Sequence, residues 1–382
     1  MSLPVYLDYN ATTPVAPEVL EAMEPFLRGQ FGNPSSAHAY GAQAADAVAK
    51  ARRQVAGLIG AHEREMVFTG CATEANNLAI AGAAWARSEK GRHLITSTIE
   101  HPSVAAPFRR LQAQGWEVTV LPVDAYGRVD PANLAAALRP DTVLVSVMHA
   151  NNEVGTIQPV AEMARLARRH GALFHTDAAQ SVGKIVVNVD ELAVDLLTLA
   201  GHKFYAPKGV GALYVRTGTP LTPVLVGAGQ EHRLRPGTEN VPCIVGLGSA
   251  AESARRMLPE LSRQLRRVRD TLHDGLLEAV AGLALNGHPV ERLPNTLNVS
   301  FPDVSGRDLL AHVEAVAASV GSACHEDEDT VSGVLAAMGI SLLRARGAIR
   351  LSTGRFTTVE QAREACNSLV AAWRSLARAA HP

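Results

Sequence analysis

The stretch DLLTLAGHKFYAPKGVGALYV, from Asp195 to Val215, decides the fold class and centres on Lys203. Its first half is a short apolar run that we predict to be a buried strand ending at Gly201. A Pro/Gly turn then leads into a second strand over 210–215. A lysine at the end of a buried strand is partly desolvated, which lowers its pKa toward neutrality and makes its amine a nucleophile toward carbonyl groups. The alternative is a loop lysine with its ammonium in water, which is the more common situation for an isolated His-Lys pair.

A second marker lies upstream in ALFHTDAAQ, from Ala172 to Gln180, where a short strand ends in Asp177. An acid at one strand end, followed by a lysine after another strand, suits pyridoxal phosphate. The lysine would hold the cofactor aldehyde as a Schiff base, and the acid would keep the pyridine nitrogen protonated so that the ring accepts electrons. We therefore expect pyridoxal 5'-phosphate as the cofactor, and we assign no metal site.

Composition argues against several other classes of protein. The chain has 382 residues, enough for two domains, with 47% hydrophobic residues and a formal net charge of −1. This charge gives no electrostatic footprint for nucleic acid or an anionic membrane, and no apolar run in the sequence reaches the length of a membrane span. The start MSLPVYLDYN lacks the pattern of a signal peptide. The cysteines show neither CxxC spacing nor a disulfide framework, so we expect a reduced, cytoplasmic protein.

Strands and helices alternate along most of the chain, with turn residues between them. We expect strands over 65–69, 93–98, 117–123, 142–148, 173–176, 195–199 and 211–215. We expect helices between them over 73–87, 103–113, 131–138 and 160–170. This alternation predicts an α/β fold with a mostly parallel, seven-stranded sheet between helices. Ligands on such sheets bind beyond the carboxyl ends of the strands, where Asp177 and Lys203 are expected.

The pattern changes from about Pro259. Apolar residues at helical spacing from Leu261 to Leu276 predict a long amphipathic helix. A strand over 295–302, a helix over 307–316, a strand over 347–354 and a helix over 359–378 follow. We therefore expect a large cofactor-binding domain over 14–258, and a smaller α+β domain made of 1–13 and 259–382.

Taken together, the motifs resemble the group I, NifS-like branch of the class V aminotransferase-fold enzymes, which contains cysteine desulfurases and selenocysteine lyases. The motifs, in chain order, are VYLDYNATTP, NPSSAHAYG, CATEANNL, EHPSV, MHANNEVG, HTDAAQ, GHKFYAPKGVGALYV, RPGTENVP, SVGSACH and GRFTT. Each is weak alone, but their shared order, from Val5 to Thr358, argues against a chance match. The resemblance implies the fold type I of PLP-dependent transferases. It also implies removal of sulfur or selenium from free L-cysteine or L-selenocysteine, which leaves L-alanine.

The resemblance implies roles for several residues around the cofactor ring. Lys203 would form the Schiff base and move the Cα proton. His101 would stack on the pyridine face and take part in proton transfer, and Asp177 would pair with the pyridinium nitrogen. Gln180 and Asn152 would hydrogen-bond the phenolic oxygen, or the substrate beside it.

A second group of residues would bind the phosphate. Thr73 opens a predicted helix, so its hydroxyl and the neighbouring backbone N–H groups, including that of Ala72, would form an anion site. A plain helix cap is the alternative for Thr73, and it does not exclude phosphate binding. The resemblance makes His202 a further ligand. It also places Thr238 at the phosphate of the neighbouring subunit, which implies a homodimer with shared active sites.

The substrate would meet residues from both ends of the chain. Arg350, on an otherwise apolar strand, would bind the substrate α-carboxylate bidentately. Asn10 would line the entrance for the substrate, and Asn152 would lie beside it. The alternative for Arg350 is a structural ion pair with an Asp or Glu.

Cys324, in SVGSACH, would be the catalytic thiol that takes sulfur from bound cysteine as a persulfide. The polar stretch from His325 to Ser332 is expected to form a loop over the cleft. This short, acidic stretch and the neighbouring motifs look closest to selenocysteine lyases and related bacterial desulfurases. We therefore expect selenocysteine to be the faster substrate, and a sulfur or selenium acceptor protein is the candidate partner.

Two positions depart from the family pattern. Ala200 stands where the phosphate loop often has Ser, which removes one hydroxyl from the phosphate site. Cys71 stands where Gly is usual, and we favour a space-filling role for it.

Two rival functions stay open. The first is another reaction on the same fold, such as that of an aminotransferase or a kynureninase-like lyase, which would not need Cys324. The second is a catalytically silent scaffold that binds sulfur-carrier proteins. Against the scaffold stand four residues with catalytic character: Lys203, Asp177, His101 and Arg350.

Overall fold

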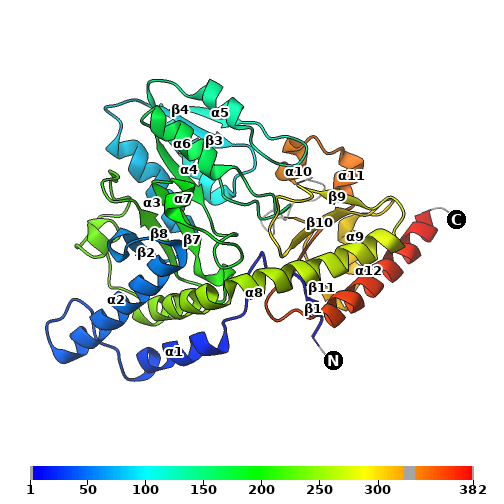
Figure 1. Ribbon diagram of the computed structural model, residues 1–382, viewed down its shortest axis with the longest axis horizontal. Helices are drawn as coiled ribbons and strands as arrows, with labels where there is room; N and C mark the ends of the chain where they lie inside the picture. The colour runs from blue at the N-terminus through cyan, green and yellow to red at the C-terminus, as the bar shows by residue number, and fades with distance from the viewer. Residues whose placement is uncertain (1–2, 322–331, 381–382) are drawn as a thin grey trace.

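The computed structural model describes residues 3–321 and 332–380 of the chain. Two packed parts lie side by side, and one long helix, α8 (Val241–Ala279), runs along both of them (Figure 1). The larger part is built around a seven-stranded sheet. The smaller part contains a three-stranded sheet and the C-terminal helices.

The seven strands of the large sheet lie in the order β2-β8-β7-β6-β5-β3-β4. They are β2 (Met66–Thr69), β3 (His93–Ser97), β4 (Glu117–Leu121), β5 (Thr142–Ser146), β6 (Leu173–Asp177), β7 (Leu196–Ala200) and β8 (Gly211–Val215). Strand β8 runs antiparallel to both of its neighbours, and the other pairs in the sheet are parallel. Strands β3, β5, β6 and β7 are buried along their whole length, as expected where helices cover both faces. The predicted mostly parallel sheet of seven strands is confirmed.

Helices cover both faces of this sheet because successive strand residues point to opposite sides. On one face α3 (Ala72–Ala86) and α4 (Pro102–Ala113) share an apolar cluster with residues such as Leu94 and Leu144. On the other face, the neighbouring strand residues Ile95 and Val145 belong to a larger cluster. The helices of that cluster are α1 (Pro17–Arg28), α2 (Ala39–Ile59), α5 (Pro131–Ala137), α6 (Val160–Arg169) and the first half of α8.

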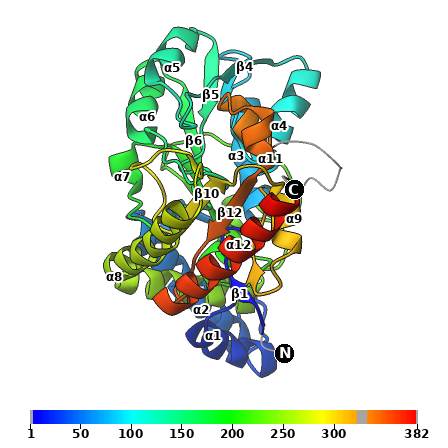
Figure 2. The ribbon, with the colours of Figure 1, turned by 90° about the vertical axis from the view of Figure 1, so that its right-hand side faces the viewer.

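The smaller part has its own apolar core. Its strands are β1 (Val5–Tyr6), β9 (Ala284–Asn286), β10 (Thr296–Ser300), β11 (Val316–Ala317) and β12 (Ala348–Ser352). Strand β10 lies between β9 and β12 in an antiparallel sheet, and β1 pairs with β11 in parallel. Helix α12 (Val359–Ala380) packs along α8, as Figure 2 shows. Val5 and Leu7 lie in this core, which supports grouping the N-terminal residues with the C-terminal part. The division at residues 13 and 258 stays a prediction.

Some elements differ from the sequence-based expectation. Helix α8 begins at Val241, and Pro259 lies inside it and not at its start. The turns of α8 before Pro259 pack against α1 and α2. The helix expected over 307–316 is α9 (Gly306–Ala311), and Val316 pairs instead with Val5. That pairing joins distant parts of the chain, so local periodicity could not indicate it. Helices α1 and α2 were not predicted.

The remaining helices are short. They are α7 (Val189–Leu192), α10 (Gly333–Ala337) and α11 (Leu342–Arg346). Within residues 3–321 and 332–380, no helix combines the length and apolar character that crossing a membrane would require.

Candidate active site

The predicted site residues gather beyond the carboxyl ends of β5, β6 and β7, around a cavity of about 300 Å³. Those that line it are Asn10, Ala72, Thr73, His101, Asn152, Asp177, Gln180, His202, Lys203 and Arg350. The fold thus brings together residues that lie hundreds of positions apart in the sequence. Their individual roles stay predictions.

Lys203 ends a short 3₁₀ turn, Gly201–Lys203, that follows β7 directly. Its Nζ donates hydrogen bonds to two backbone carbonyl oxygens of the N-terminal segment, at 2.6 Å to Asn10 and 2.8 Å to Ala11. The turn is tight: a Cβ on Gly201 would lie 2.9 Å from the carbonyl oxygen of Val210. The backbone of the N-terminal segment therefore holds the amine at the cavity wall.

Asp177 is the last residue of β6, and its side chain is buried. Its Oδ2 accepts from Asn76 Nδ2 at 2.7 Å, and its Oδ1 accepts from the backbone N–H of Ala179 at 2.9 Å. No Lys, Arg or His of the described ranges forms an ion pair with this carboxylate within 4.0 Å. A buried carboxylate with only neutral donors is stabilised by a cation placed beside it, such as a protonated ring nitrogen.

His101 is the N-cap residue of α4. Its Nδ1 accepts from the backbone N–H of Ser103 at 3.1 Å and lies 2.8 Å from the Ser103 hydroxyl. Burial lowers the pKa of His101; nearby Asp177 opposes this, and Lys203 adds to it. The ring is therefore neutral at neutral pH, and because Nδ1 accepts, the proton belongs on Nε2.

Asn76 joins the two groups just described. One amide nitrogen donates both to Asp177 and to the Ser103 hydroxyl, the latter at 2.9 Å. A single chain of hydrogen bonds therefore connects the acid at the end of β6 with the imidazole at the start of α4. Sequence reasoning missed Asn76 and Ser103. Asn76 lies three residues after Thr73, so the shared face of a predicted helix was the available signal.

The N-terminus of α3 points at the same cavity. Cys71 is the N-cap residue and makes no side-chain cap, and Cys71, Ala72 and Thr73 all line the cavity. Free backbone N–H groups and the helix dipole favour an anion at such a position. On the cavity wall, burial and the charges of nearby lysines lower the pKa of His202 to about 4, so this ring is a neutral donor or acceptor.

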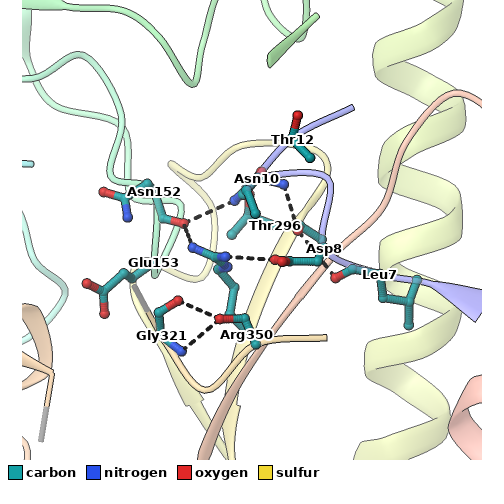
Figure 3. A network of polar contacts seen from close by, with 12 residues as sticks. Leu7, Asp8, Asn10, Thr12, Asn152, Glu153, Thr296, Gly321 and Arg350 are labelled. Carbon is teal, nitrogen blue, oxygen red and sulfur yellow. Dashed lines mark hydrogen bonds and ion pairs between the residues drawn. The ribbon is translucent and has the colours of Figure 1, made fainter. Parts of the chain in front are cut away.

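Arg350 was open to two interpretations from the sequence, a structural ion pair or a binding site for the substrate carboxylate. Its side chain is buried, and its Nη2 binds Asp8 Oδ1 at 2.7 Å while its Nη1 donates to the carbonyl oxygen of Asn152 at 3.1 Å (Figure 3). The structural ion pair is therefore present. Its Nε atom is also buried and has no hydrogen-bond partner in the described part of the chain. A guanidinium that lines the cavity with one unsatisfied donor retains capacity for a further anion.

One described residue of the predicted site, Thr238, is not among those that line the cavity of this chain. Thr238 is exposed on the loop that precedes α8. Cys324 lies outside the described residues, so its position relative to the cavity is a prediction from sequence alone.

Lys184 and Glu100 are further polar groups that sequence reasoning missed. Both are buried close to the site. Lys184 Nζ donates to Gln180 Oε1 at 2.8 Å, and Glu100 Oε1 accepts from the backbone N–H of Met148 at 2.9 Å. Lys184 lies outside the quoted motifs, and Glu100 opens the motif EHPSV but has no role that its local sequence indicates.

These groups fit pyridoxal phosphate. The cavity offers an amine for its aldehyde, a buried carboxylate bound by neutral donors for its ring nitrogen, and a helix N-terminus for its phosphate. These side chains and backbone groups therefore agree with the cofactor expected from the sequence.

Comparisons with known proteins point to the same family. The Aminotransferase class-V family model matches residues 5–364. "Cysteine desulfurase IscS" of Dictyoglomus turgidum is 48% identical and aligns over 94% of this chain and 92% of its own length. The protein of the same name from Methanosarcina thermophila is 48% identical over 93% of this chain and 88% of its own length.

Solved structures agree. A "NIFS-LIKE PROTEIN" superposes with a TM-score of 0.92 at 38% identity and covers 98% of this chain and 100% of its own. "SspA in complex with cysteine" superposes with a TM-score of 0.82 at 38% identity and covers 92% of this chain and 99% of its own. The expected NifS-like resemblance is confirmed, and members of this family depend on pyridoxal phosphate. From the match of the family model over nearly the whole length and the identity to its relatives, the chain belongs to the class-V aminotransferase family.

Proposed function

We propose that the protein is a PLP-dependent cysteine desulfurase that removes sulfur from free L-cysteine, forms L-alanine and leaves the sulfur on Cys324 as a persulfide. One observation carries the proposal: the Lys203 amine, the Asp177 carboxylate and the N-terminus of α3 line one cavity. The relatives named cysteine desulfurase support cysteine as the substrate, as does the similar structure that contains it. Selenocysteine is a second substrate of the same chemistry, and its faster turnover stays a prediction from sequence.

In this proposal each side of the cavity holds one part of the cofactor. Lys203 would bind its aldehyde carbon and Asp177 its ring nitrogen, with His101 beside the ring. Gln180 and Asn152 would hydrogen-bond the phenolic oxygen. The backbone N–H groups at the start of α3, the Thr73 hydroxyl and His202 would hold the phosphate. When bound, pyridoxal phosphate supplies an electron sink that stabilises negative charge at the substrate Cα.

The protein groups then hold the substrate and move its protons. Arg350 binds the α-carboxylate through the side of its guanidinium that the Asp8 ion pair leaves unsatisfied. The Lys203 amine, once neutral, takes the proton from Cα and returns it later. His101, neutral and protonated on Nε2, donates a hydrogen bond or a proton beside the ring. The Cys324 thiolate attacks the substrate sulfur, because a thiolate is the reactive form of cysteine. As the S–S bond forms, the Cβ–S bond breaks and its electron pair stays with the carbon skeleton, which takes up a proton to give alanine.

A homodimer with shared active sites is part of the proposal. Thr238 is exposed and lies outside the cavity of its own chain, which suits a residue that serves the partner's phosphate site. The same loop region exposes apolar side chains: Val226 is 90% and Leu225 51% accessible. Exposed apolar groups on one region are typical of a surface that another chain covers.

We also propose a cytoplasmic location and delivery of the sulfur to an acceptor protein. Cys71, Cys243 and Cys366 are free thiols within the described ranges, which suits a reducing compartment. A persulfide on Cys324 needs a thiol or another nucleophile to accept its outer sulfur, so an acceptor follows from the chemistry.

The first test replaces the proposed cofactor lysine. Purified protein loaded with pyridoxal phosphate should be yellow and should form alanine from L-cysteine. Lys203→Ala should lose both the visible absorbance and the activity, because no other amine is assigned to hold the aldehyde. Lys208→Ala, an exposed lysine five positions later in the same loop, is the matched control and should behave like the wild type. A Lys203→Ala protein that keeps the visible band and the activity would overturn the proposal.

A further inference from the structure

Lys184 is a buried lysine that the proposed function does not use. It lies in the turn region between β6 and α7, and its side chain is only 5% exposed. Its Nζ donates to Gln180 Oε1 at 2.8 Å and to Asn10 Oδ1 at 3.2 Å. Both acceptors belong to residues that line the active-site cavity.

These two hydrogen bonds fix the orientation of two side-chain amides. A lysine with its N–H bonds directed at two groups can only donate to them, so each amide must turn its oxygen toward Lys184. The Nε2 group of Gln180 is then turned away, and it donates to the carbonyl oxygen of Asn10 at 3.0 Å. That same carbonyl oxygen accepts from Lys203 Nζ at 2.6 Å. An amide without such a partner can rotate by half a turn and exchange its donor for its acceptor.

Asn10 is held in the matching orientation by its other neighbours. Its Nδ2 donates to Thr296 Oγ1 at 2.8 Å and to the carbonyl oxygen of Asn152 at 3.2 Å. Its Oδ1 also accepts from Asn295 Nδ2 at 3.0 Å. Several hydrogen bonds therefore fix the orientation of the Asn10 amide. The side-chain oxygen of Gln180, in contrast, accepts from Lys184.

The surroundings of Lys184 disfavour a positive charge on its side chain. Burial lowers its pKa well below the usual range for lysine, and the nearby cations Lys203 and Arg350 lower it further. No carboxylate of the described ranges lies within 4.0 Å of its nitrogen. Its Nζ instead donates to two amide oxygens. Such a group is costly to bury, so its hydrogen bonds need a structural or functional reason.

We propose that Lys184 is a positioning residue, which holds the amide of Gln180 so that Nε2, with its second hydrogen, faces the cofactor's phenolic oxygen. The inference rests on the proposed function, because it concerns the cofactor bound to Lys203. A phenolic oxygen carries negative charge and accepts hydrogen bonds, so it requires the nitrogen and not the oxygen of the amide. Lys184 acts on the cofactor through Gln180 and does not touch it.

The pH titration of the visible absorbance reports on this contact. The band depends on a proton at the Lys203 nitrogen, which the neighbouring phenolic oxygen shares. Without the Gln180 donor that oxygen holds the proton more strongly, so the titration midpoint rises. The other ionisable groups lining this cavity in the described residues are Cys71, Lys203, Arg350, Asp177, His101 and His202, and all of them are kept in the variants.

The experiment compares holoproteins by absorbance across pH. Lys184→Met, which keeps the length of the side chain without a donor, should raise the midpoint by about one pH unit, a tenfold change in proton affinity. Gln180→Leu should give a similar rise. The double variant should show no further rise, because the two residues act in series. Lys208→Met, in an exposed loop, is the control and should titrate like the wild type.

An unchanged midpoint in Lys184→Met, or additive rises in the double variant, would overturn the proposal. If Lys184→Met does not fold, Lys184→Gln tests the same point, since an amide at position 184 can accept as well as donate and no longer dictates the orientation of Gln180. It should give a smaller rise, and a midpoint equal to that of the wild type would count against the proposal. Failure of the proposed function looks different: the wild type with added pyridoxal phosphate would then show no visible band at all.

Discussion

Glu100, at the scale of single residues, shows how strongly the interior next to the site departs from water. It directly precedes His101 and is buried. Its Oε1 accepts from the Ser97 hydroxyl at 2.6 Å and from the backbone N–H of Met148 at 2.9 Å. Burial nevertheless raises the pKa of Glu100 to about 8, because two neutral donors do not replace the hydration of a carboxylate. The acid is therefore largely protonated at neutral pH.

This pKa predicts a pH-dependent effect of Glu100→Gln on stability. A raised pKa in the folded state makes the wild type most stable, relative to the variant, below the unfolded value of about 4.5. That contribution to the free energy of unfolding is lost as the pH rises to about 8. Above this pH the difference in stability between the wild type and the variant stays constant. The variant keeps an oxygen for both donors, so its free energy of unfolding should exceed that of the wild type by roughly 2–5 kcal/mol at pH 9.

Denaturant unfolding at a series of pH values checks this prediction. Glu89→Gln, at an exposed position, is the control and should show no such pH-dependent gain. If the difference in free energy of unfolding between Glu100→Gln and the wild type is the same at pH 5 and pH 9, the conclusion that Glu100 is buried in its protonated form is wrong.

The positions of the candidate site residues could be predicted from the sequence where a polar residue follows a strand. Lys203 and Asp177 each follow an apolar run, so the sheet places them at one edge whatever the details of packing. Asn76, Lys184 and Glu100 carry no such mark. Their contacts depend on how a helix, a turn and a strand end meet in space, which local periodicity does not encode.

At the scale of elements, the start of α3 depends on its fit against β8. Gly211, the first residue of β8, lies directly under the N-terminus of α3. A Cβ there would lie 2.8 Å from the carbonyl carbon of Cys71 and 2.9 Å from the backbone nitrogen of Ala72. Both contacts are with backbone atoms, which cannot rotate away. The glycine therefore lets the proposed phosphate-binding turn sit against the sheet.

Gly211→Ala should displace this turn and weaken the phosphate contacts. We expect the affinity for pyridoxal phosphate to fall by about tenfold or more, which is a loss of about 1.4 kcal/mol. Titration of the apoprotein with the cofactor, followed by absorbance, measures this. Gly29→Ala, where a Cβ would meet no atom within 4 Å, is the matched control and should bind normally. Wild-type affinity in Gly211→Ala would show that the start of α3 does not bind the phosphate.

Elements whose boundaries depend on tertiary contacts were the hardest to predict. The strands of the large sheet were expected within a few residues of their observed ends, because most of them are short, largely apolar runs between turn residues. Helix α8 was placed too late, since its first half is rich in small residues that pack on α1 and α2 and carry little amphipathic signal. Strand β11 exists through its pairing with β1, at the other end of the chain.

At the scale of the whole molecule, the cavity depends on both parts of the chain. Arg350 comes from β12 of the smaller part, Asn10 from the N-terminal segment, and Lys203 from the end of the large sheet. Helix α8 runs along both parts and fixes their relative position (Figure 1). The proposed dimer would add a third contribution, from Thr238 of the second copy.

The dimer predicts a mass of about twice that of one chain by light scattering. Val226→Glu places a charge at a 90% exposed apolar position and should shift the protein toward monomers that retain the cofactor poorly. Val186→Glu, at an apolar position that is 72% exposed on another part of the chain, is the control and should leave the mass unchanged. Thr238→Val should leave the dimer intact and its mass unchanged, but should weaken the binding of pyridoxal phosphate. A fully active monomer would rule out shared active sites.

The most direct test of the central claim follows the sulfur atom. Holoprotein is mixed with L-cysteine in the absence of reductant, then digested and analysed by mass spectrometry while alanine is measured in the same sample. The account predicts one added sulfur on the peptide that contains Cys324, and alanine in matching amount. Cys324→Ala should form neither from cysteine, whereas Cys243→Ala should behave like the wild type. A keto acid in place of alanine, with Cys324 left unmodified, would contradict the account and favour an aminotransferase.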